Sequence, residues 1–371
     1  MKRVLAALLW IIGILVVLFA VLLFLFGGRA QAVTLLLAAL IVLPPGRRLI
    51  ARLARRAVPR WVFALALVLL GGLFVLVGQL TRPTSIYKSA AVRERVRQIY
   101  AEKMKGWPVP HESRYVETSR GRVHVIVSGP RSAPPMLLLH ASGVAAWSWK
   151  FNAAALSAKH RTYAIDLIGD VGRSELKSMD HALKSGRDQA ELYVEITRKL
   201  GVGRACVVGA SEGGFIATNY ALHAPERVSG LVLVGPMGYT GAIESAFRIT
   251  LAQNFPTESM QRRTFEWAFS SDPKLGAELG EWFRLVMTGY NPAKVAPLPF
   301  SAEERRRLRV PTLFVLGKRD NLVGDPAAAR ALVSDIPAVR VEVLDTGHLV
   351  AAEKPDATNA LILEHCHRDR T

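Results

Sequence analysis

The stretch Gly209-Ala210-Ser211-Glu212-Gly213 decides the fold that this sequence predicts. It is a G-x-S-x-G pentapeptide between an apolar run, 205–208, and a helix-like stretch, 215–224. A strand, a tight turn and a helix in this order lift a serine hydroxyl onto a sharp elbow, because the two glycines leave room for a strained backbone. A serine hydroxyl is a poor nucleophile at neutral pH. It needs a base, a group that orients the base, and N–H donors for the oxyanion.

Short apolar runs surround the elbow and alternate with helical stretches such as 186–200. They cover residues 136–140, 163–167, 205–208, 231–234, 312–316 and 339–344. This βαβ rhythm predicts a mostly parallel sheet, preceded by a hairpin over 115–118 and 122–128. Residues 236–311 interrupt the rhythm with an aromatic-rich insertion that has no strand-like run. We expect a helical lid at about 237–310.

An acid and a histidine follow predicted strands later in the chain. Asp320 comes after 313–316, and His348 comes after 341–344. The carboxyl ends of parallel strands form the ligand edge of a sheet, and the chain order Ser, Asp, His is that of nucleophile-elbow hydrolases. We therefore predict Ser211 as nucleophile, His348 as base and Asp320 as the orienting acid, with Asp325 and Asp345 as rivals for the acid.

Two backbone N–H groups are predicted to form the oxyanion hole. One belongs to Glu212, which follows the nucleophile, and the other to the loop His140-Ala141-Ser142-Gly143, where Ser142 is the favoured donor. The side chain of Glu212 is expected in solvent or in a salt bridge at the helix N-terminus, not on the substrate.

From about residue 107 onward the chain resembles the α/β-hydrolase superfamily. The matching motifs are the loop at 140–143, the D-x-x-G-x-G-x-S turn at 166–174, the elbow, the P-E-R-V turn at 225–228 and the G-H pair at 347–348. Two departures are Ala141 in place of the usual loop glycine and the charged Asp170. The resemblance implies an α/β-hydrolase fold, with a mostly parallel eight-stranded sheet, flanking helices and a helical lid. The Trp107-Pro108-Val109-Pro110 lead-in and the Ile168-Gly169-Asp170 turn also look like a bacterial branch of hydrolases related to carboxylesterases.

The expected activity is that of a membrane-anchored serine hydrolase that cleaves a lipophilic acyl ester or thioester. Its partners would be a small acyl substrate, with a lipid as one candidate, and the membrane, with no cofactor and no metal. A C–C bond hydrolase or a perhydrolase with the same triad is an alternative, and so is a catalytically silent, membrane-tethered binding module. Serine at the elbow argues against epoxide hydrolases and haloalkane dehalogenases of the superfamily, which use aspartate there.

The N-terminal third predicts a membrane region over residues 1–83. Half of the 371 residues are hydrophobic, and three apolar segments, 4–26, 28–43 and 61–80, suggest transmembrane helices, the second being short. If all three segments span, one side of the membrane carries eight positive charges and the other side carries six. This difference favours a multi-pass protein with an extracytoplasmic catalytic domain. If 28–43 does not span, the domain faces the cytoplasm instead.

Most of the net charge of +18 lies in residues 1–110, which hold 16 Lys or Arg and two acids. Because these positive charges flank apolar runs, anionic lipid is the expected partner and nucleic acid is not. Residues 84–110 are predicted as a linker with an amphipathic helix, either on a membrane surface or packed on the hydrolase domain, which would cover 111–371. Cys206 and Cys366 are expected as unpaired thiols.

Overall fold

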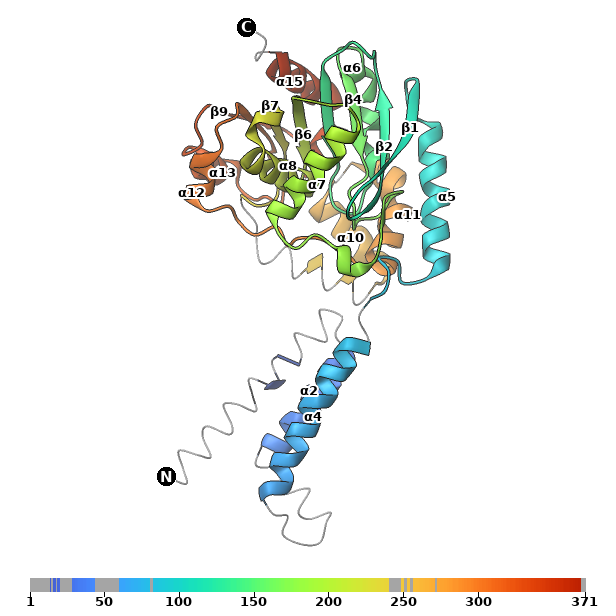
Figure 1. Ribbon diagram of the computed structural model, residues 1–371, viewed down its shortest axis with the longest axis vertical. Helices are drawn as coiled ribbons and strands as arrows, with labels where there is room; N and C mark the ends of the chain where they lie inside the picture. Colours follow the sequence, from blue (N-terminus) through green and yellow to red (C-terminus); the bar gives the residue numbers. More distant parts are fainter. Residues whose placement is uncertain are drawn as a thin grey trace. The chain divides into compact units, whose positions relative to one another are not determined.

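The computed structural model describes residues 14, 16, 17, 19, 20, 29–43, 60–80, 83–239, 248, 249, 252, 253, 256–270 and 272–367 (Figure 1). The chain divides into two compact units. One unit comprises Met1–Pro83 with Gln253–Phe255, and the other comprises Thr84–Ala252 with Pro256–Thr371.

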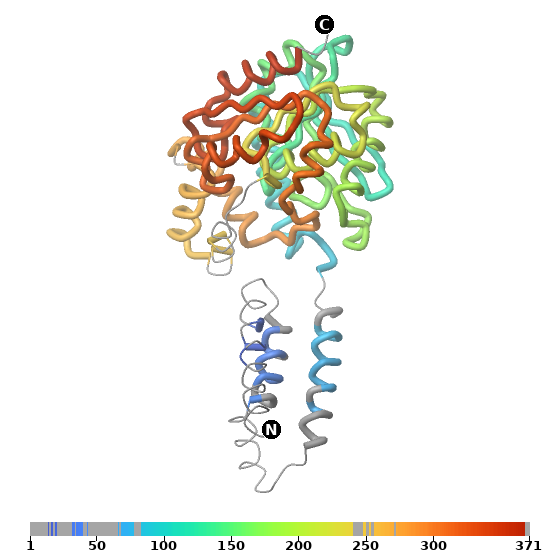
Figure 2. The backbone as a smooth tube through the Cα atoms, turned by 90° about the vertical axis from the view of Figure 1, so that its left-hand side faces the viewer, coloured from blue at the N-terminus to red at the C-terminus, as the bar shows by residue number. Residues whose placement is uncertain are grey.

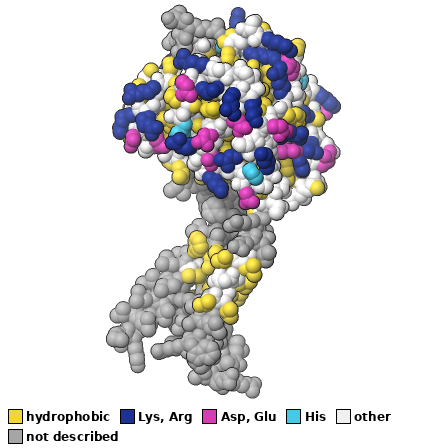
Figure 3. Space-filling model, viewed as in Figure 1, with side chains coloured by type: hydrophobic (Ala, Val, Ile, Leu, Met, Phe, Trp, Pro, Cys, Tyr) yellow, Lys and Arg dark blue, Asp and Glu magenta, His cyan; other side chains and the backbone are white. Residues whose placement is uncertain are grey.

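The first unit contains helices α2 (Arg29–Val42) and α4 (Arg60–Leu80), which pack against each other. The side chains described on both helices include exposed large apolar groups such as Val33 and Val68. Figure 3 shows hydrophobic side chains at the surface of the described part of this unit. Crossing a membrane requires about 20 consecutive apolar residues in one helix. Within the described ranges, none of the helices is both long and apolar enough to do so. The predicted multi-pass membrane location with an extracytoplasmic catalytic domain is therefore wrong, and most of the predicted span 4–26 lies outside the described residues.

The second unit is built on one mixed, mostly parallel sheet, as predicted. Its strands are β1 (His111–Glu117), β2 (Gly121–Ser128), β3 (Pro135–Leu139), β4 (Arg161–Ile165), β5 (Glu175–Leu176), β6 (Ala205–Ala210), β7 (Val228–Val234), β8 (Thr312–Gly317) and β9 (Val339–Leu344). Eight strands follow the order β1-β2-β4-β3-β6-β7-β8-β9, and the two-residue β5 pairs with β2. The predicted hairpin is β1–β2, and every neighbouring pair from β4 to β9 along this order is parallel.

Strand side chains alternate between two hydrophobic cores, because successive residues of a strand point to opposite faces of the sheet. On β3, Leu137 and Leu139 join one core and Met136 and Leu138 join the other. The first core contains residues of α7 (Gly186–Lys199), α8 (Glu212–His223) and α13 (Pro326–Val333), so these helices cover one face. The second contains residues of α6 (Ala153–Ser157), α14 (Val350–Glu353) and α15 (Pro355–His367), which cover the other face (Figures 1 and 2).

The insertion after β7 combines helices with an irregular stretch over residues 290–301 in its described parts. It includes α10 (Glu258–Ala268), α11 (Pro273–Gly289) and α12 (Ala302–Arg307), and we refer to residues 237–310 as the lid. Helix α5 (Ala90–Lys105) packs on α11 (Figure 1), and its buried Ile99 and Tyr100 share a third hydrophobic cluster with Trp147 and Trp282. In this structure the linker helix therefore packs on the second unit, which is one of the two arrangements considered for it.

The two cysteines are not free. Cys206 of β6 and Cys366 of α15 form a disulfide across a sequence separation of 160 residues, with Cα atoms 5.8 Å apart. The prediction of unpaired thiols was wrong, because chain folding brings together two residues whose sequence positions give no sign of proximity. The bond joins the C-terminal helix to the strand that leads into the elbow.

We predict that reduction of this disulfide destabilises the fold. Closing a loop of this length in the unfolded chain is worth roughly 3–5 kcal/mol, which corresponds to a fall of roughly 10 °C in Tm. Thermal unfolding with and without dithiothreitol measures the effect, and the double variant Cys206→Ala/Cys366→Ala should not respond to the reductant. A wild-type midpoint that dithiothreitol leaves unchanged would contradict the prediction.

Candidate active site

The elbow after β6 has the backbone that the pentapeptide predicts. Ser211 adopts φ 50° and ψ −114°, a backbone conformation that residues other than glycine rarely adopt. A Cβ atom on Gly209 would lie 2.3 Å from the carbonyl oxygen of Gly213, and one on Gly213 would lie 2.2 Å from that of Leu139. Both glycines are therefore required, because the helix start presses directly on strands β6 and β3.

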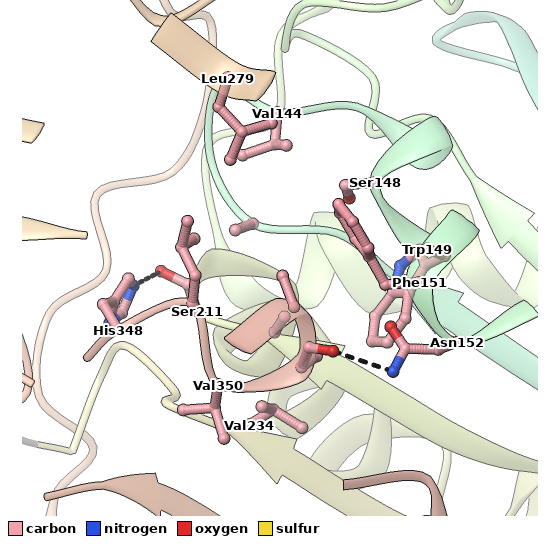
Figure 4. Close-up of a pocket in the computed structure, with 15 residues that line it drawn as sticks. Val144, Ser148, Trp149, Phe151, Asn152, Ser211, Val234, Leu279, His348 and Val350 are labelled. Carbon is pink, nitrogen blue, oxygen red and sulfur yellow. Dashed lines mark hydrogen bonds between the residues drawn. The ribbon is translucent and has the colours of Figure 1, made fainter. Parts of the chain in front are cut away.

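The three residues predicted to act together are brought into one hydrogen-bonded chain. The Oγ atom of Ser211 lies 2.9 Å from Nε2 of His348, and Nδ1 of His348 lies 2.7 Å from Oδ2 of Asp320 (Figure 4 shows the first contact). The other carboxylate oxygen of Asp320 accepts hydrogen bonds from the N–H groups of Leu322 and Val323 at 2.9 and 3.0 Å. The serine, histidine and aspartate are 6%, 5% and 3% exposed, so the chain is shielded from bulk water.

The two other candidates for the acid, Asp325 and Asp345, form contacts with residues other than His348. Asp325 accepts a hydrogen bond from the N–H of Ala327 at 2.9 Å and caps α13. Asp345 is exposed and pairs with Arg319. Of the three candidates, Asp320 alone is hydrogen-bonded to His348 in the described chain.

The lid fixes the backbone of the histidine. The N–H groups of His348 and Leu349 both donate to the carbonyl oxygen of Phe269, at 2.9 and 3.2 Å, just after α10. A Cβ atom on Gly347 would lie 2.8 Å from the same carbonyl oxygen, so the approach requires glycine. The end of α10 is thus part of the support of His348.

A second Ser–His–Asp chain lies at the other side of the sheet. Nε2 of His124 is 2.6 Å from Oγ of Ser113, and Nδ1 is 2.8 Å from Oδ2 of Asp166. Ser113 sits on the regular strand β1, and it does not line any of the described pockets. Hydrogen bonding alone therefore does not make a nucleophile. The Ser211 chain differs in having a strained elbow and an adjoining pocket.

The predicted oxyanion residues, Ser142 and Glu212, meet at one lysine. Lys294 Nζ donates to Oγ of Ser142, and it lies 2.5 Å from Oε2 of Glu212 and 3.4 Å from Oδ2 of Asp170. Asp170 in turn accepts from the N–H of Gly143 at 2.9 Å. The prediction of a salt bridge for Glu212 is confirmed. Its partner was missed, because a single lysine in an aromatic-rich insertion gives no sequence signal.

The alanine in the oxyanion loop is accommodated without backbone strain. In the described chain Ala141 is not among the residues with positive φ, whereas Gly143 has φ 70°. The position in this loop that favours glycine is therefore residue 143 and not residue 141. The substitution at Ala141 leaves the loop intact.

Charges in this cluster offset one another. Burial raises the pKa of Glu212, and the nearby Lys294 offsets this only in part. Burial also raises the pKa of Asp170. Lys294, His140 and the Gly143 N–H outweigh this effect, so the pKa of Asp170 lies below its usual value. Burial disfavours the charged form of Lys294, yet Asp170 and Glu212 hold its pKa above the usual value. The lysine is thus a cation held between two buried carboxyl groups.

An apolar pocket opens beside Ser211. Its walls include Val144, Trp149 and Phe151 from the loop and turn after β3, and Leu279 from lid helix α11 (Figure 4). Its free volume is about 50 Å³. The pocket can receive an apolar group next to the serine hydroxyl. Among the residues with described positions, no cluster of three His, Cys, Asp or Glu side chains could hold a metal ion.

Comparison with known proteins agrees with this geometry. Residues 136–361 match the model of the Alpha/beta hydrolase family. A Bacillus subtilis (strain 168) protein named uncharacterized carboxylesterase nap is 30% identical over 279 residues, which is 72% of this chain and 91% of that protein. Carboxylesterase YbfK of the same organism is 29% identical over 285 residues, or 74% of this chain and 95% of that protein.

A solved structure gives the same result. The crystal structure of carboxylesterase CesB (YbfK) from Bacillus subtilis superposes with a TM-score of 0.69 at 26% identity, and covers 75% of this chain and 99% of that one. The fold and these homologues support an ester-hydrolysing enzyme. The chain therefore belongs to the alpha/beta hydrolase family.

Proposed function

We propose that this protein is a serine carboxylesterase in which Ser211, His348 and Asp320 form the catalytic triad. The observation that carries the proposal is the 2.9 Å contact between Ser211 Oγ and His348 Nε2, made from a strained elbow that opens into an apolar pocket. The chain is similar to two carboxylesterases over most of their length, and this similarity supports the same class of reaction.

The reaction follows from the hydrogen-bonded chain. Ser211 Oγ attacks the ester carbonyl carbon while His348 Nε2 takes its proton, and Asp320 holds the Nδ1–H and stabilises the imidazolium. The tetrahedral oxyanion is held by the N–H groups of Ser142 and Glu212. Collapse expels the alcohol, which receives the proton from His348. Water, deprotonated by the same histidine, then attacks the acyl-enzyme, and the carboxylic acid leaves with Ser211 restored.

The pocket favours a small lipophilic acyl group. Its walls are mostly aliphatic and aromatic, so an apolar chain is stabilised there by about 0.8 kcal/mol per buried methylene. A free volume of about 50 Å³ has room for roughly four water molecules. With the lid in this position we therefore expect short acyl chains to be preferred over long ones.

Covalent labelling tests the proposed nucleophile. A fluorophosphonate should modify wild-type protein at Ser211, and Ser211→Ala should lose the label and on the order of 10⁶-fold in kcat. Ser113→Ala is the matched control, because Ser113 belongs to a separate Ser–His–Asp chain, with His124 and Asp166, and lies on the regular strand β1. It should label like wild type. Wild-type protein that stays unlabelled while a control esterase reacts would favour a binding module over an enzyme.

Enlarging the pocket tests the acyl site. Leu279→Ala removes a wall contributed by the lid, and it should raise kcat/KM for a hexanoate ester relative to the acetate ester roughly tenfold, because buried methylenes then find room. Leu275→Ala is the control: Leu275 lies one turn earlier on α11 and is equally buried at 5%, but does not line the pocket. An equal change in both variants, or in neither, would contradict this position for the acyl group.

A further inference from the structure

The lid places a cation directly behind the proposed oxyanion hole. Lys294 follows α11 in sequence, and its side chain is 18% exposed. It reaches Ser142 and Glu212, the two residues whose N–H groups are proposed to hold the oxyanion. No step of the proposed reaction uses this lysine.

Glu212 poses an electrostatic problem for an oxyanion hole. Its side chain is 4% exposed and belongs to the residue that directly follows the nucleophile. A carboxylate there would repel the negative charge that develops on the substrate oxygen, and burial strengthens that repulsion. The Lys294 ammonium, 2.5 Å from the carboxylate, opposes this repulsion.

The same lysine ties down the loop that carries the other donor. Its ammonium donates to Ser142 Oγ, and Asp170, its second carboxylate partner, accepts from the Gly143 N–H. A second lid residue, Trp282, donates from Nε1 to the carbonyl oxygen of Gly143 at 2.7 Å. The conformation of loop 140–143 therefore depends on contacts with the lid.

We propose that Lys294 is a positioning residue of the oxyanion hole, which neutralises Glu212 and holds the Ser142 loop, so that seating of the lid completes the site. The inference rests on the proposed function and extends it, since the lid then controls transition-state stabilisation as well as access. Removal of Lys294 should lower kcat much more than it raises KM, because the interaction matters most when the oxyanion forms.

The charge relation predicts a distinctive pH dependence. The ionisable groups that face the Glu212 carboxyl are Lys294, Asp170, Tyr193 and Tyr290. Without the lysine cation, the already raised pKa of Glu212 rises further. Below that pKa the carboxyl is neutral and does not oppose the oxyanion. As the pH rises through it, Glu212 ionises and kcat falls.

The experiment compares kcat of Lys294→Met with wild type from pH 6 to 9, using a short-chain p-nitrophenyl ester. The ratio of variant to wild-type kcat removes the pH dependence that the two proteins have in common. We expect this ratio to fall with rising pH to roughly 10- to 100-fold below unity at pH 9, while KM changes less than threefold. Lys294→Met/Glu212→Gln should restore a pH-independent ratio, because its residue 212 carries no charge.

Lys103→Met controls for the loss of a lid-anchoring ion pair. Lys103 has the same side-chain exposure of 18% and pairs with Glu278 of α11 at 2.8 Å. It should keep the wild-type kcat and pH profile. Any of three results would overturn the inference. The kcat ratio of Lys294→Met could be independent of pH, the double variant could show the same decline in this ratio as the single variant, or Lys103→Met could lose as much kcat as Lys294→Met.

Labelling separates this failure from failure of the proposed function. If wild type is labelled at Ser211 and turns over ester while Lys294→Met keeps its kcat at every pH, the role of Lys294 alone is refuted. If wild type is neither labelled nor active, the serine hydrolase proposal fails and the role of Lys294 fails with it.

Discussion

The site depends on one strained residue, Ser211, whose backbone is held in the left-handed half of φ space. Such a conformation costs on the order of 1–3 kcal/mol and persists only where its surroundings impose it. Here the N–H of Ser211 donates to Val234 of β7, its carbonyl oxygen accepts from Met237, and Gly209 and Gly213 let α8 press on the sheet. The turn places the hydroxyl at the strand ends, where it contacts His348, which follows β9, and the histidine contacts Asp320, which follows β8.

The lid contributes to the site as well as covering it. The carbonyl of Phe269 fixes the backbone of His348, Trp282 bonds the oxyanion loop, and Lys294 lies between that loop and Glu212. Each contact joins the insertion to a different part of the proposed machinery. A movement of the lid would break these contacts with His348 and loop 140–143, and under the proposed function it would couple substrate entry to catalysis.

The sequence predicted those parts of the molecule that local chemistry determines. Strands such as 205–208 were recognisable because short apolar runs alternate with helices, and the order of Ser211, Asp320 and His348 was readable because each follows a strand. Contacts between remote segments were not readable. The Cys206–Cys366 pairing and the position of Lys294 arise only when the chain folds. The membrane prediction was wrong because it rested on apolar composition alone. None of the helices in the described part of the chain is both long and apolar enough to cross a membrane.

The most direct test of the central claim is a crystal structure of the protein with a phosphonate bound covalently to Ser211. The phosphonyl oxygen stands where the oxyanion of the reaction would be. We expect this oxygen to lie roughly 2.7–3.1 Å from the backbone nitrogens of both Ser142 and Glu212, with Lys294 still beside the Glu212 carboxyl. An oxygen that points away from these two nitrogens, or an adduct on another residue, would contradict it.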